Sequence, residues 1–257
     1  MSRILFVFIS FTFAVNWSSA QFSIGHATIT FNDPTRTGGF GTGGGSGRQI
    51  QTEIYYPATT AGDNMPVASG TFPVIVFGHG FAMSWDAYQN IWEHYAPKGY
   101  ILAFPRTESG LFPAPSHQDF GLDLKIVGQK LIALNTSSTS LFFQKILSNI
   151  GIIGHSMGGG ASILAASGNN AIRTVVGLAP AETNPSAIAA SSAVSVPALI
   201  FSGSQDGVTP PNDHHLPIFN NLGSGCKTFA SIIGGAHCYF ANSNFNCDFG
   251  EATSSSG

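Results

Sequence analysis

A serine turn bounded by glycines is the feature that most constrains how this chain can fold. Residues 150–153 are apolar, and the segment Gly-His-Ser-Met-Gly-Gly-Gly follows them directly at positions 154–160. The apolar run predicts a buried strand and the residues after the glycines predict a helix, so Ser156 sits at a strand-to-helix turn. Such a turn strains the serine backbone and leaves room only for small residues two positions before and after it, where Gly154 and Gly158 stand. The pattern predicts a nucleophilic serine whose hydroxyl stands clear of a sheet.

A glycine-rich turn around a serine can also arise by chance in a chain that contains 31 glycines. In that case the segment would be a plain turn with no chemical role. The context favours the nucleophile, because a strand precedes the serine, a helix follows it, and acid and base candidates occur later in the chain.

Strand and helix patterns alternate along the rest of the chain. Apolar or alternating runs predict strands at residues 22–31, 49–56, 72–77, 100–104, 174–178, 198–202 and 228–233, and helical spacing predicts helices at 86–96, 119–134, 141–147 and 213–221. Between the first two strands, seven of the ten residues 38–47 are glycine, which predicts a flexible surface loop. The alternation predicts an α/β fold with a mostly parallel central sheet, helices on both faces and an antiparallel pair at the N-terminal edge.

The loops after two later strands carry an acid and a base. Asp206 lies four residues past an apolar strand in a turn-rich loop, and His237 follows the final strand after a Gly-Gly pair. Ligands bind at the carboxyl ends of parallel strands, so these loops should meet Ser156 at one edge of the sheet. The order serine, aspartate, histidine is one of the chain orders known for catalytic triads, although Asp206 could also be a plain turn aspartate.

These residues predict acyl transfer. His237 removes the proton of Ser156 as its oxygen attacks a carbonyl carbon, Asp206 orients the imidazolium, and water then hydrolyses the acyl-enzyme through the same base. The oxyanion needs two amide donors, and we expect the N–H groups of Met157 and of Phe81, which follows a buried strand through Gly-His-Gly. A tight turn without a ligand is the alternative for that upstream segment.

The other histidines are expected to serve different purposes. His155 precedes the serine and should line the pocket without taking the proton. His214 and His215 stand at the start of a predicted helix, where we expect exposed or capping side chains. We expect the histidines without a partner spacing to be structural: His26, His94 and His117.

The first 20 residues have the pattern of a secretory signal peptide, with an arginine, an apolar run and small residues at the cleavage positions. We therefore expect a secreted protein with one domain over residues 21–250 and a serine-rich tail or linker at 251–257. No later stretch is long and apolar enough to predict a membrane span. Only 9% of residues are charged and the net charge is −3, so neither nucleic acid nor an anionic membrane surface is an expected partner, and we expect a monomer.

Three cysteines, Cys226, Cys238 and Cys247, lie in the last quarter of the chain. Export to an oxidising compartment favours a disulfide among them. We predict the bond between Cys238 and Cys247, because the eight residues between them can close a loop that tethers the segment after His237, and Cys226 is then left as a thiol. The cysteine spacing does not match a zinc site, and we expect neither a metal nor a cofactor.

The motifs resemble those of a known group of enzymes. The serine segment at 154–160, Gly80-Phe81 upstream, Asp206 before Thr209-Pro210 and His237 after Gly-Gly are similar to the bacterial cutinase-like polyester hydrolases. This group includes poly(ethylene terephthalate) hydrolases and belongs to the α/β-hydrolase superfamily. The resemblance covers nearly all of the chain after the signal peptide and implies an α/β-hydrolase fold.

The resemblance also implies residues that contact the substrate. Phe81 takes the place of an aromatic residue that packs on the acyl group, and His155, Met157 and Trp85 are expected beside the cleft. Many members carry a tryptophan after the strand that follows the serine helix, where this chain has Ala181. An aromatic wall of the cleft should therefore be missing at Ala181.

The leading hypothesis is a secreted serine carboxylic ester hydrolase that acts on polyesters or other bulky hydrophobic esters. The chlorophyllase-like and dienelactone-hydrolase-like branches share the same triad, so a small-ester or lactone hydrolase is an alternative, and a peptidase is a further one. From a different class, a non-catalytic binding protein on a hydrolase scaffold is disfavoured, because the serine, the aspartate, the histidine and their glycines are all present.

Overall fold

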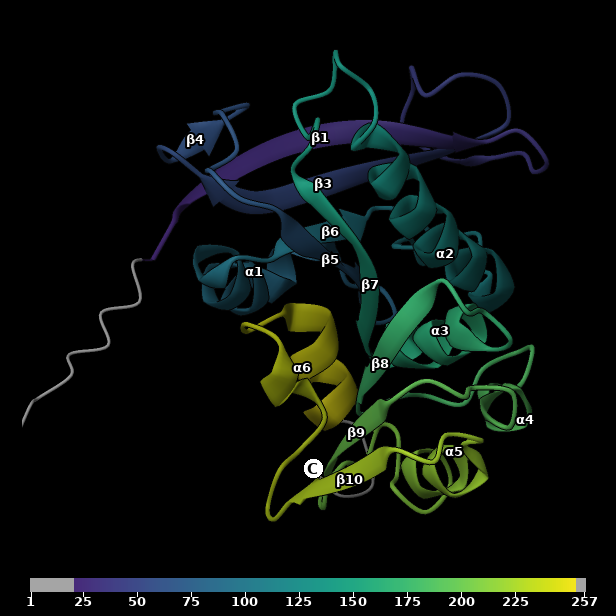
Figure 1. Cartoon of the computed structure of the whole chain (residues 1–257). Helices are drawn as coiled ribbons and strands as arrows, with labels where there is room; N and C mark the ends of the chain where they lie inside the picture. Colours follow the sequence, from purple (N-terminus) through teal and green to yellow (C-terminus); the bar gives the residue numbers. More distant parts are fainter. Residues whose placement is uncertain (1–20, 253–257) are drawn as a thin grey trace, which may run out of the picture.

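One ten-stranded sheet runs through the structure (Figure 1). The computed structural model describes residues 21–252, so the predicted signal peptide and residues 253–257 of the predicted tail lie outside the described part. Across the sheet the strand order is β10-β9-β8-β7-β5-β6-β3-β1-β4, with β2 paired to β3. The strands are β1 (Ser23–Asp33), β2 (Gly39–Phe40), β3 (Arg48–Ala58), β4 (Gly62–Asp63), β5 (Phe72–Gly78), β6 (Ile101–Pro105), β7 (Ile146–His155), β8 (Ile172–Leu178), β9 (Ala198–Gly203) and β10 (Lys227–Ile232).

The pairing confirms the predicted fold class. Strands β5 to β10 pair in parallel, whereas β3 runs antiparallel to both β1 and β6 at the N-terminal edge. In the register, Gly78 at the end of β5 lies beside Gly154 near the end of β7, and Ile232 of β10 lies beside Gly203 of β9. The carboxyl ends of four strands therefore meet at one edge of the sheet, where ligands bind in parallel sheets.

Helices cover both faces of the sheet. In Figure 1, α2 to α5 lie on one side and α1 and α6 on the other. The helices are α1 (Gln89–Tyr95), α2 (His117–Leu134), α3 (Met157–Ala166), α4 (Ala187–Ser191), α5 (His215–Asn221) and α6 (Phe245–Ala252), with short 3-10 helices η1 (Trp85–Tyr88), η2 (Ala96–Lys98) and η3 (Cys238–Phe240).

Two separate cores explain why the central strands are apolar throughout. Successive side chains of a strand point to opposite faces, so Val74 and Val76 of β5 pack under α2 and α3, whereas Ile75 and Phe77 pack under α1 and the Cys238 segment. Each large apolar side chain buried in this way contributes about 1.5–3 kcal/mol to folding. The continuous apolar run of β5 predicted a strand buried on both faces, and this prediction is confirmed.

An ion-pair network ties the N-terminal edge of the sheet to α2. Arg36 bridges Asp33 of β1 and the fully buried Asp123 of α2, both at 2.6 Å, and Arg48 of β3 also binds Asp123 at 2.8 Å. Burial alone would raise the pKa of Asp33, but hydrogen bonds from Thr35 and Arg36 outweigh it and lower this pKa to about 2. The Asp33 carboxylate is therefore held in its charged form.

The glycine-rich segment is more ordered than its composition predicts. Residues 39 and 40 form strand β2 against β3. The side chain of Gln49 accepts a hydrogen bond from the amide of Gly44 and donates to the carbonyls of Gly45 and Gly47. One amide side chain thus anchors the loop to β3, and most residues of the loop are exposed at the surface, as expected.

The helix predicted at residues 141–147 is wrong. Residues 141–145 form turns and strand β7 begins at Ile146. Asn135, just after α2, accepts hydrogen bonds from the amides of Gln144 through its main chain and of Ile146 through its side chain. These bonds take up backbone donors that a helix would need.

Helices α4 and α6 were not predicted. Both are short, and α6 extends to Ala252, so it includes Glu251 and Ala252, which the sequence places in the serine-rich tail. Within residues 21–252, no helix combines the length and the apolar character needed to cross a bilayer.

Candidate active site

Ser156 occupies the predicted turn between β7 and α3. Its backbone angles are φ 55° and ψ −120°, a left-handed conformation that is strained for a serine. A Cβ on Gly154 would lie 2.1 Å from the carbonyl oxygen of Gly158, and a Cβ on Gly158 would lie 2.2 Å from that of Gly78. Only glycine fits at both positions, so the two glycines are required by the close approach of three backbone segments.

Asp206 and His237 meet at the same edge of the sheet. Asp206 follows β9 and His237 follows β10, and the Oδ2 of Asp206 lies 2.7 Å from the Nδ1 of His237. The Oδ1 of Asp206 accepts hydrogen bonds from the amides of Val208 and Thr209 at 3.0 and 2.8 Å. Burial would raise the pKa of Asp206, but the hydrogen bond and charge of His237 outweigh it and lower this pKa. An ionised Asp206 keeps the proton on Nδ1 of His237, which leaves Nε2 as the basic nitrogen.

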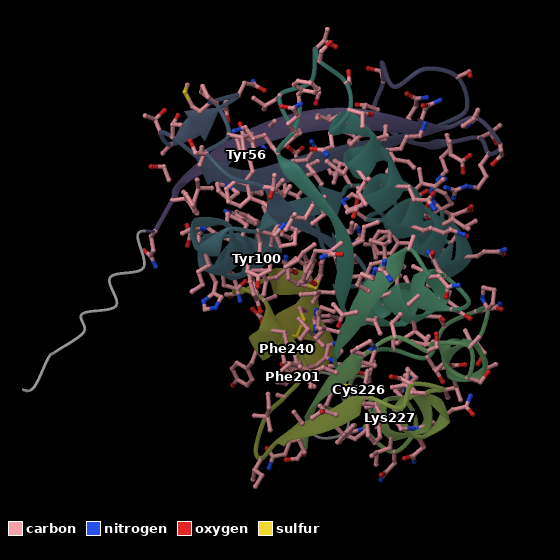
Figure 2. The ribbon with its side chains drawn as sticks, viewed as in Figure 1. Tyr56, Tyr100, Phe201, Cys226, Lys227 and Phe240 are labelled. Carbon is pink, nitrogen blue, oxygen red and sulfur yellow. A yellow bond between two sulfur atoms is a disulfide. The ribbon has the colours of Figure 1, made fainter. Side chains whose placement is uncertain are left out.

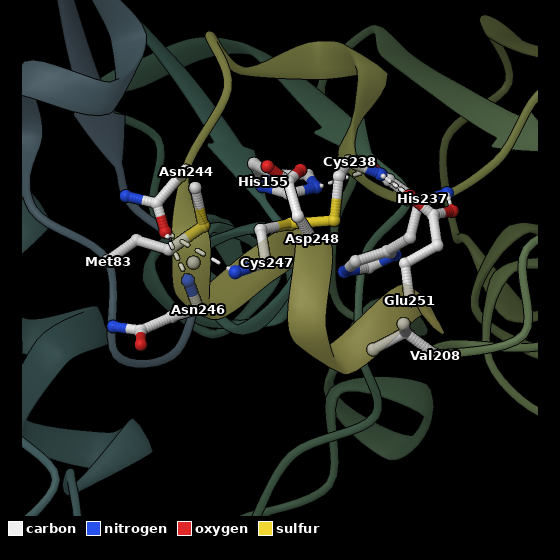
Figure 3. Close-up of a disulfide and its surroundings, with 12 residues drawn as sticks. Met83, His155, Val208, His237, Cys238, Asn244, Asn246, Cys247, Asp248 and Glu251 are labelled. Atoms are coloured by element: carbon white, nitrogen blue, oxygen red, sulfur yellow. Dashed lines mark hydrogen bonds between the residues drawn. A yellow bond between two sulfur atoms is a disulfide. The ribbon is translucent and has the colours of Figure 1, made fainter. Parts of the chain in front are cut away.

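Ser156 and His237 line one small pocket. Its volume is about 100 Å³, and its wall is mostly apolar. Phe81, which is half-exposed, forms part of that wall on the side of β5. The remaining lining residues come from two loops and from α6: Met83, Val208, Asn246, Cys247 and Gly250. Figure 3 shows Met83 and Val208 on either side of the disulfide segment, with the His237 ring beside Val208.

His155 does not line the pocket, which corrects the prediction. The side chain is fully buried, its Nδ1 lies 2.9 Å from the hydroxyl of Tyr88, and its Nε2 lies 3.0 Å from the main-chain oxygen of His237. The side chain of Met157 is also buried, in the core beneath α3. The expectation that these two side chains contact substrate is therefore wrong, because protein groups surround both of them.

Neither Trp85 nor Ala181 is among the residues that line this pocket. Trp85 packs in an aromatic cluster with Tyr55 and Trp92 and borders a different pocket, which Phe40 also lines. Ala181 is half-buried, and its amide donates to the main-chain oxygen of the serine at 2.9 Å. Ala181 thus supports the backbone of the turn instead of forming a wall of the pocket.

Another buried histidine, His215, lies behind Asp206, where an exposed or capping side chain was predicted. His215 is fully buried, its Nδ1 lies 2.8 Å from the hydroxyl of Ser202, and its Nε2 lies 3.0 Å from the hydroxyl of Thr209. The same Thr209 hydroxyl lies 3.1 Å from Asp206 Oδ2 and 3.0 Å from the Nδ1 of His237. Burial lowers the pKa of His215 to about 4, against the opposing charge of Asp206, so this ring is neutral near pH 7.

The prediction for His215 is therefore wrong, and the side chain of His214 makes no capping hydrogen bond to α5 either. His214 occupies the N-cap position of α5, is half-buried, and accepts a hydrogen bond from the amide of Glu182 through its Nδ1. The signal for His215 was present in the sequence. His215, Ile218 and Leu222 are spaced three and four residues apart, which places them on one buried face of a helix.

The predicted disulfide between Cys238 and Cys247 is present, and Cys226 is a free, exposed thiol. The bond joins η3 to α6. The carboxylate of Glu251, also on α6, accepts hydrogen bonds from the amides of His237 and Cys238 (Figure 3). Helix α6 is thereby attached at two points to the loop that carries His237. Among residues 21–252, no group of three or more histidine, cysteine or acidic side chains could hold a metal ion.

The mostly parallel sheet, with a serine turn between β7 and α3 and an acid and a base after later strands, defines an α/β-hydrolase fold. The chain belongs to the PET hydrolase-like family, whose family model matches residues 15–253.

Named relatives are similar over most of this chain at low identity. Cutinase 1 of Thermobifida cellulosilytica is 24% identical over 221 residues, which cover 86% of this chain and 73% of the relative. A cutinase of Thermobifida fusca is 24% identical over 86% of this chain and 64% of its own length. Bis(hydroxyethyl) terephthalate hydrolase of Streptomyces coelicolor is 26% identical over 72% of this chain, and the match spans about half of that relative, 51%. These relatives are ester hydrolases, and at such identity the loops that set substrate range can differ.

Proposed function

We propose that the protein is a secreted serine hydrolase of carboxylic esters. One observation carries this proposal: Ser156, in a strained turn, shares a pocket with His237, whose other ring nitrogen is bound to the buried carboxylate of Asp206. A nucleophile, a base and a group that orients the base are thus brought together from three loops far apart in the chain.

The reaction follows from these positions. Nε2 of His237 takes the hydroxyl proton of Ser156 as the oxygen attacks the ester carbonyl, and the same proton then passes to the departing alkoxide. The acyl group is left on Ser156. Water attacks it with His237 again as the base, which releases the acid and restores the serine. Asp206 stays ionised throughout and stabilises the transient imidazolium.

Two amides are suited to receive the negative charge on the carbonyl oxygen. Met157 is the first residue of α3, where helix N–H groups point outward and the helix dipole favours an anion. Phe81 follows β5, which pairs directly with β7, and the register sets Gly78 beside Gly154. The N–H groups of Met157 and Phe81 are therefore our proposed oxyanion donors.

The substrate class is proposed from the wall of the pocket and from the relatives. Phe81, Met83 and Val208 give the pocket an apolar lining without a charged side chain, which suits a hydrophobic acyl group. The printed names of the relatives, cutinase and bis(hydroxyethyl) terephthalate hydrolase, support polyesters or bulky hydrophobic esters as substrates.

The size of the pocket favours a second candidate, hydrolysis of small esters. Its volume of about 100 Å³ is below the roughly 300–1,000 Å³ of pockets that enclose drug-sized ligands. A short acyl group would be enclosed, whereas a polymer would leave most of its length outside. Secretion is supported by the pattern of residues 1–20 and by the Cys238–Cys247 bond, which is stable in oxidising compartments.

The test is the variant Ser156→Ala, with Ser192→Ala as the matched control because Ser192 is an exposed serine at the end of α4. We expect Ser156→Ala to lower hydrolysis of p-nitrophenyl butyrate by about 10³-fold or more with little change in the unfolding temperature, and to abolish labelling by phenylmethylsulfonyl fluoride. The control should keep both properties. If Ser156→Ala retained more than about a tenth of the activity, the site would be assigned wrongly.

Substrate range is then measured on p-nitrophenyl esters of increasing chain length and on amorphous poly(ethylene terephthalate) film. Release of terephthalate products from the film supports the polyester proposal. Activity confined to the shortest esters supports the small-ester candidate instead.

A further inference from the structure

A chain of buried hydrogen bonds runs beneath the candidate active site. The amide of Gly80 donates to the hydroxyl oxygen of Tyr88 at 2.8 Å, that oxygen lies 2.9 Å from Nδ1 of His155, and Nε2 of His155 lies 3.0 Å from the main-chain oxygen of His237. The side chains of Tyr88 and His155 are fully buried. Neither has a part in the proton transfers proposed above, so their burial as polar groups needs an explanation.

The direction of each hydrogen bond follows by elimination. A carbonyl oxygen can only accept, so Nε2 of His155 carries the proton and donates to His237. Nδ1 of the neutral ring must then accept, so the Tyr88 hydroxyl donates to it, and the Tyr88 oxygen remains the acceptor for the Gly80 amide. The sulfur of Met83, 3.2 Å from the same oxygen, is a weak acceptor and does not change this assignment.

The chain of hydrogen bonds keeps this arrangement over a wide pH range. Burial lowers the pKa of His155 to about 3, and burial raises the pKa of Tyr88 above its ordinary value. Both groups are therefore neutral near pH 7. The direction of the hydrogen bonds does not reverse while the enzyme works.

This chain of hydrogen bonds connects three of the four loops that the proposed mechanism uses. Gly80 directly precedes Phe81, His155 directly precedes Ser156, and the third contact is made to His237 itself. A Cβ on Gly80 would lie 2.7 Å from the Met83 sulfur and 3.2–3.3 Å from Tyr88 and His155, so the Gly80 backbone rests directly on this pair.

Packing holds both rings in place. The Tyr88 ring lies 4.6 Å from that of Phe77, and the His155 ring lies 4.7 Å from the His237 ring and 5.8 Å from that of Phe240. The hydrogen-bonded side chains of Tyr88 and His155 therefore have little freedom to adjust to a displaced loop.

We propose that Tyr88 and His155 are positioning residues that hold the Phe81 amide and His237 in register with Ser156. This inference rests on the proposed function. It assigns to Tyr88, a residue of the short helix η1, a role in catalysis that operates through its contacts with Gly80 and His155.

The variant Tyr88→Phe removes the hydroxyl and keeps the ring. The matched control is Tyr56→Phe, because Tyr56 is also fully buried and its hydroxyl donates one hydrogen bond, to the Met65 carbonyl at 2.8 Å. Figure 2 shows Tyr56 far along the molecule from Phe240, which packs on His155. We expect Tyr88→Phe to lower kcat by about 10- to 100-fold with KM changed less than about threefold, and Tyr56→Phe to leave both nearly unchanged.

A second readout separates positioning from general destabilisation. Sulfur accepts hydrogen bonds poorly, so a well-placed oxyanion site prefers an ester to the matching thionoester. If Tyr88 positions the Phe81 amide, Tyr88→Phe should lower the ester-to-thionoester rate ratio, whereas Tyr56→Phe should not. An unchanged ratio in Tyr88→Phe, or an equal loss of kcat in the two variants, overturns the proposal.

A double variant tests whether Tyr88 and His155 act together. We expect Tyr88→Phe and His155→Leu to lower kcat by less in combination than the product of their separate effects, because one hydrogen-bond chain is broken in each case. Independent effects overturn the proposal. If Tyr88→Phe fails to fold, the variants His155→Gln and His155→Leu are compared instead. Glutamine can still accept a hydrogen bond from Tyr88 and donate one to the His237 carbonyl, so His155→Gln should have a higher kcat than His155→Leu. An equal loss of kcat in these two variants overturns the proposal.

The proposed function and the positioning role are refuted by different results. If Ser156→Ala stays active, the serine assignment is wrong whatever Tyr88→Phe does. If Ser156→Ala is inactive while Tyr88→Phe keeps full activity and an unchanged ester-to-thionoester ratio, only the positioning role is wrong.

Discussion

Removal of the disulfide between Cys238 and Cys247 tests how much this bond contributes to the stability of the protein and to the pocket wall that α6 forms. The two cysteines are nine residues apart, and closing a loop of that length restricts the unfolded chain by about 2–3 kcal/mol. For a domain of this size each kcal/mol corresponds to roughly 2–4 °C, so the double variant Cys238→Ala/Cys247→Ala should unfold about 4–12 °C below the wild-type protein.

The assay is thermal unfolding with and without dithiothreitol, and Cys226→Ala is the matched control because Cys226 is a free, exposed thiol. We expect the reductant to lower the unfolding temperature of the wild-type protein and of the control, and to leave that of the double variant unchanged. Ester hydrolysis should also fall in the double variant below its unfolding temperature, because Asn246, Cys247 and Gly250 line the pocket. A double variant that unfolds within about 1 °C of the wild-type protein would refute this reasoning.

Two further predictions concern a backbone contact and a carboxylate. Gly158→Ala should abolish activity and lower the yield of folded protein, because its Cβ would lie 2.2 Å from the carbonyl oxygen of Gly78, whereas Gly225→Ala, with open space around its Cβ, should behave as the wild-type protein in both measurements. The pKa of Asp33, about 2, lies below its unfolded value of roughly 3.9, so its carboxylate stabilises the fold above about pH 4 and this contribution is lost as the pH falls toward 2. Urea unfolding should therefore show Asp33→Asn to be less stable than the wild-type protein at pH 6 and to approach it at about pH 2.5; an equal difference at both pH values would count against this account.

Local constraints made much of the fold and part of the site predictable. The serine turn could be predicted because a Cβ at either of its two glycines would clash with a neighbouring backbone segment. The parallel strands could be read because a sheet covered on both faces needs continuous apolar runs. The pairing of Asp206 with His237 followed from strand ends that such a sheet must bring to one edge.

The surroundings of the site were not predictable, because they depend on partners remote in the chain. His155 can be buried because Tyr88, 67 residues earlier, donates a hydrogen bond to one ring nitrogen and the carbonyl of His237, 82 residues later, accepts one from the other. Residues 141–147 have an apolar spacing that suits a helix, but Asn135 captures their amides. None of these three partners could be identified from spacing in one sequence.

The residues that complete one wall of the pocket follow the last strand of the sheet in the sequence. Pairing of the sheet is complete at Ile232, whereas His237, η3, α6 and the Cys238–Cys247 bond all come after it. The sheet and the serine turn can therefore assemble before one wall of the pocket exists, and oxidation of the two thiols adds a covalent attachment to the hydrogen bonds that Glu251 makes with the same loop.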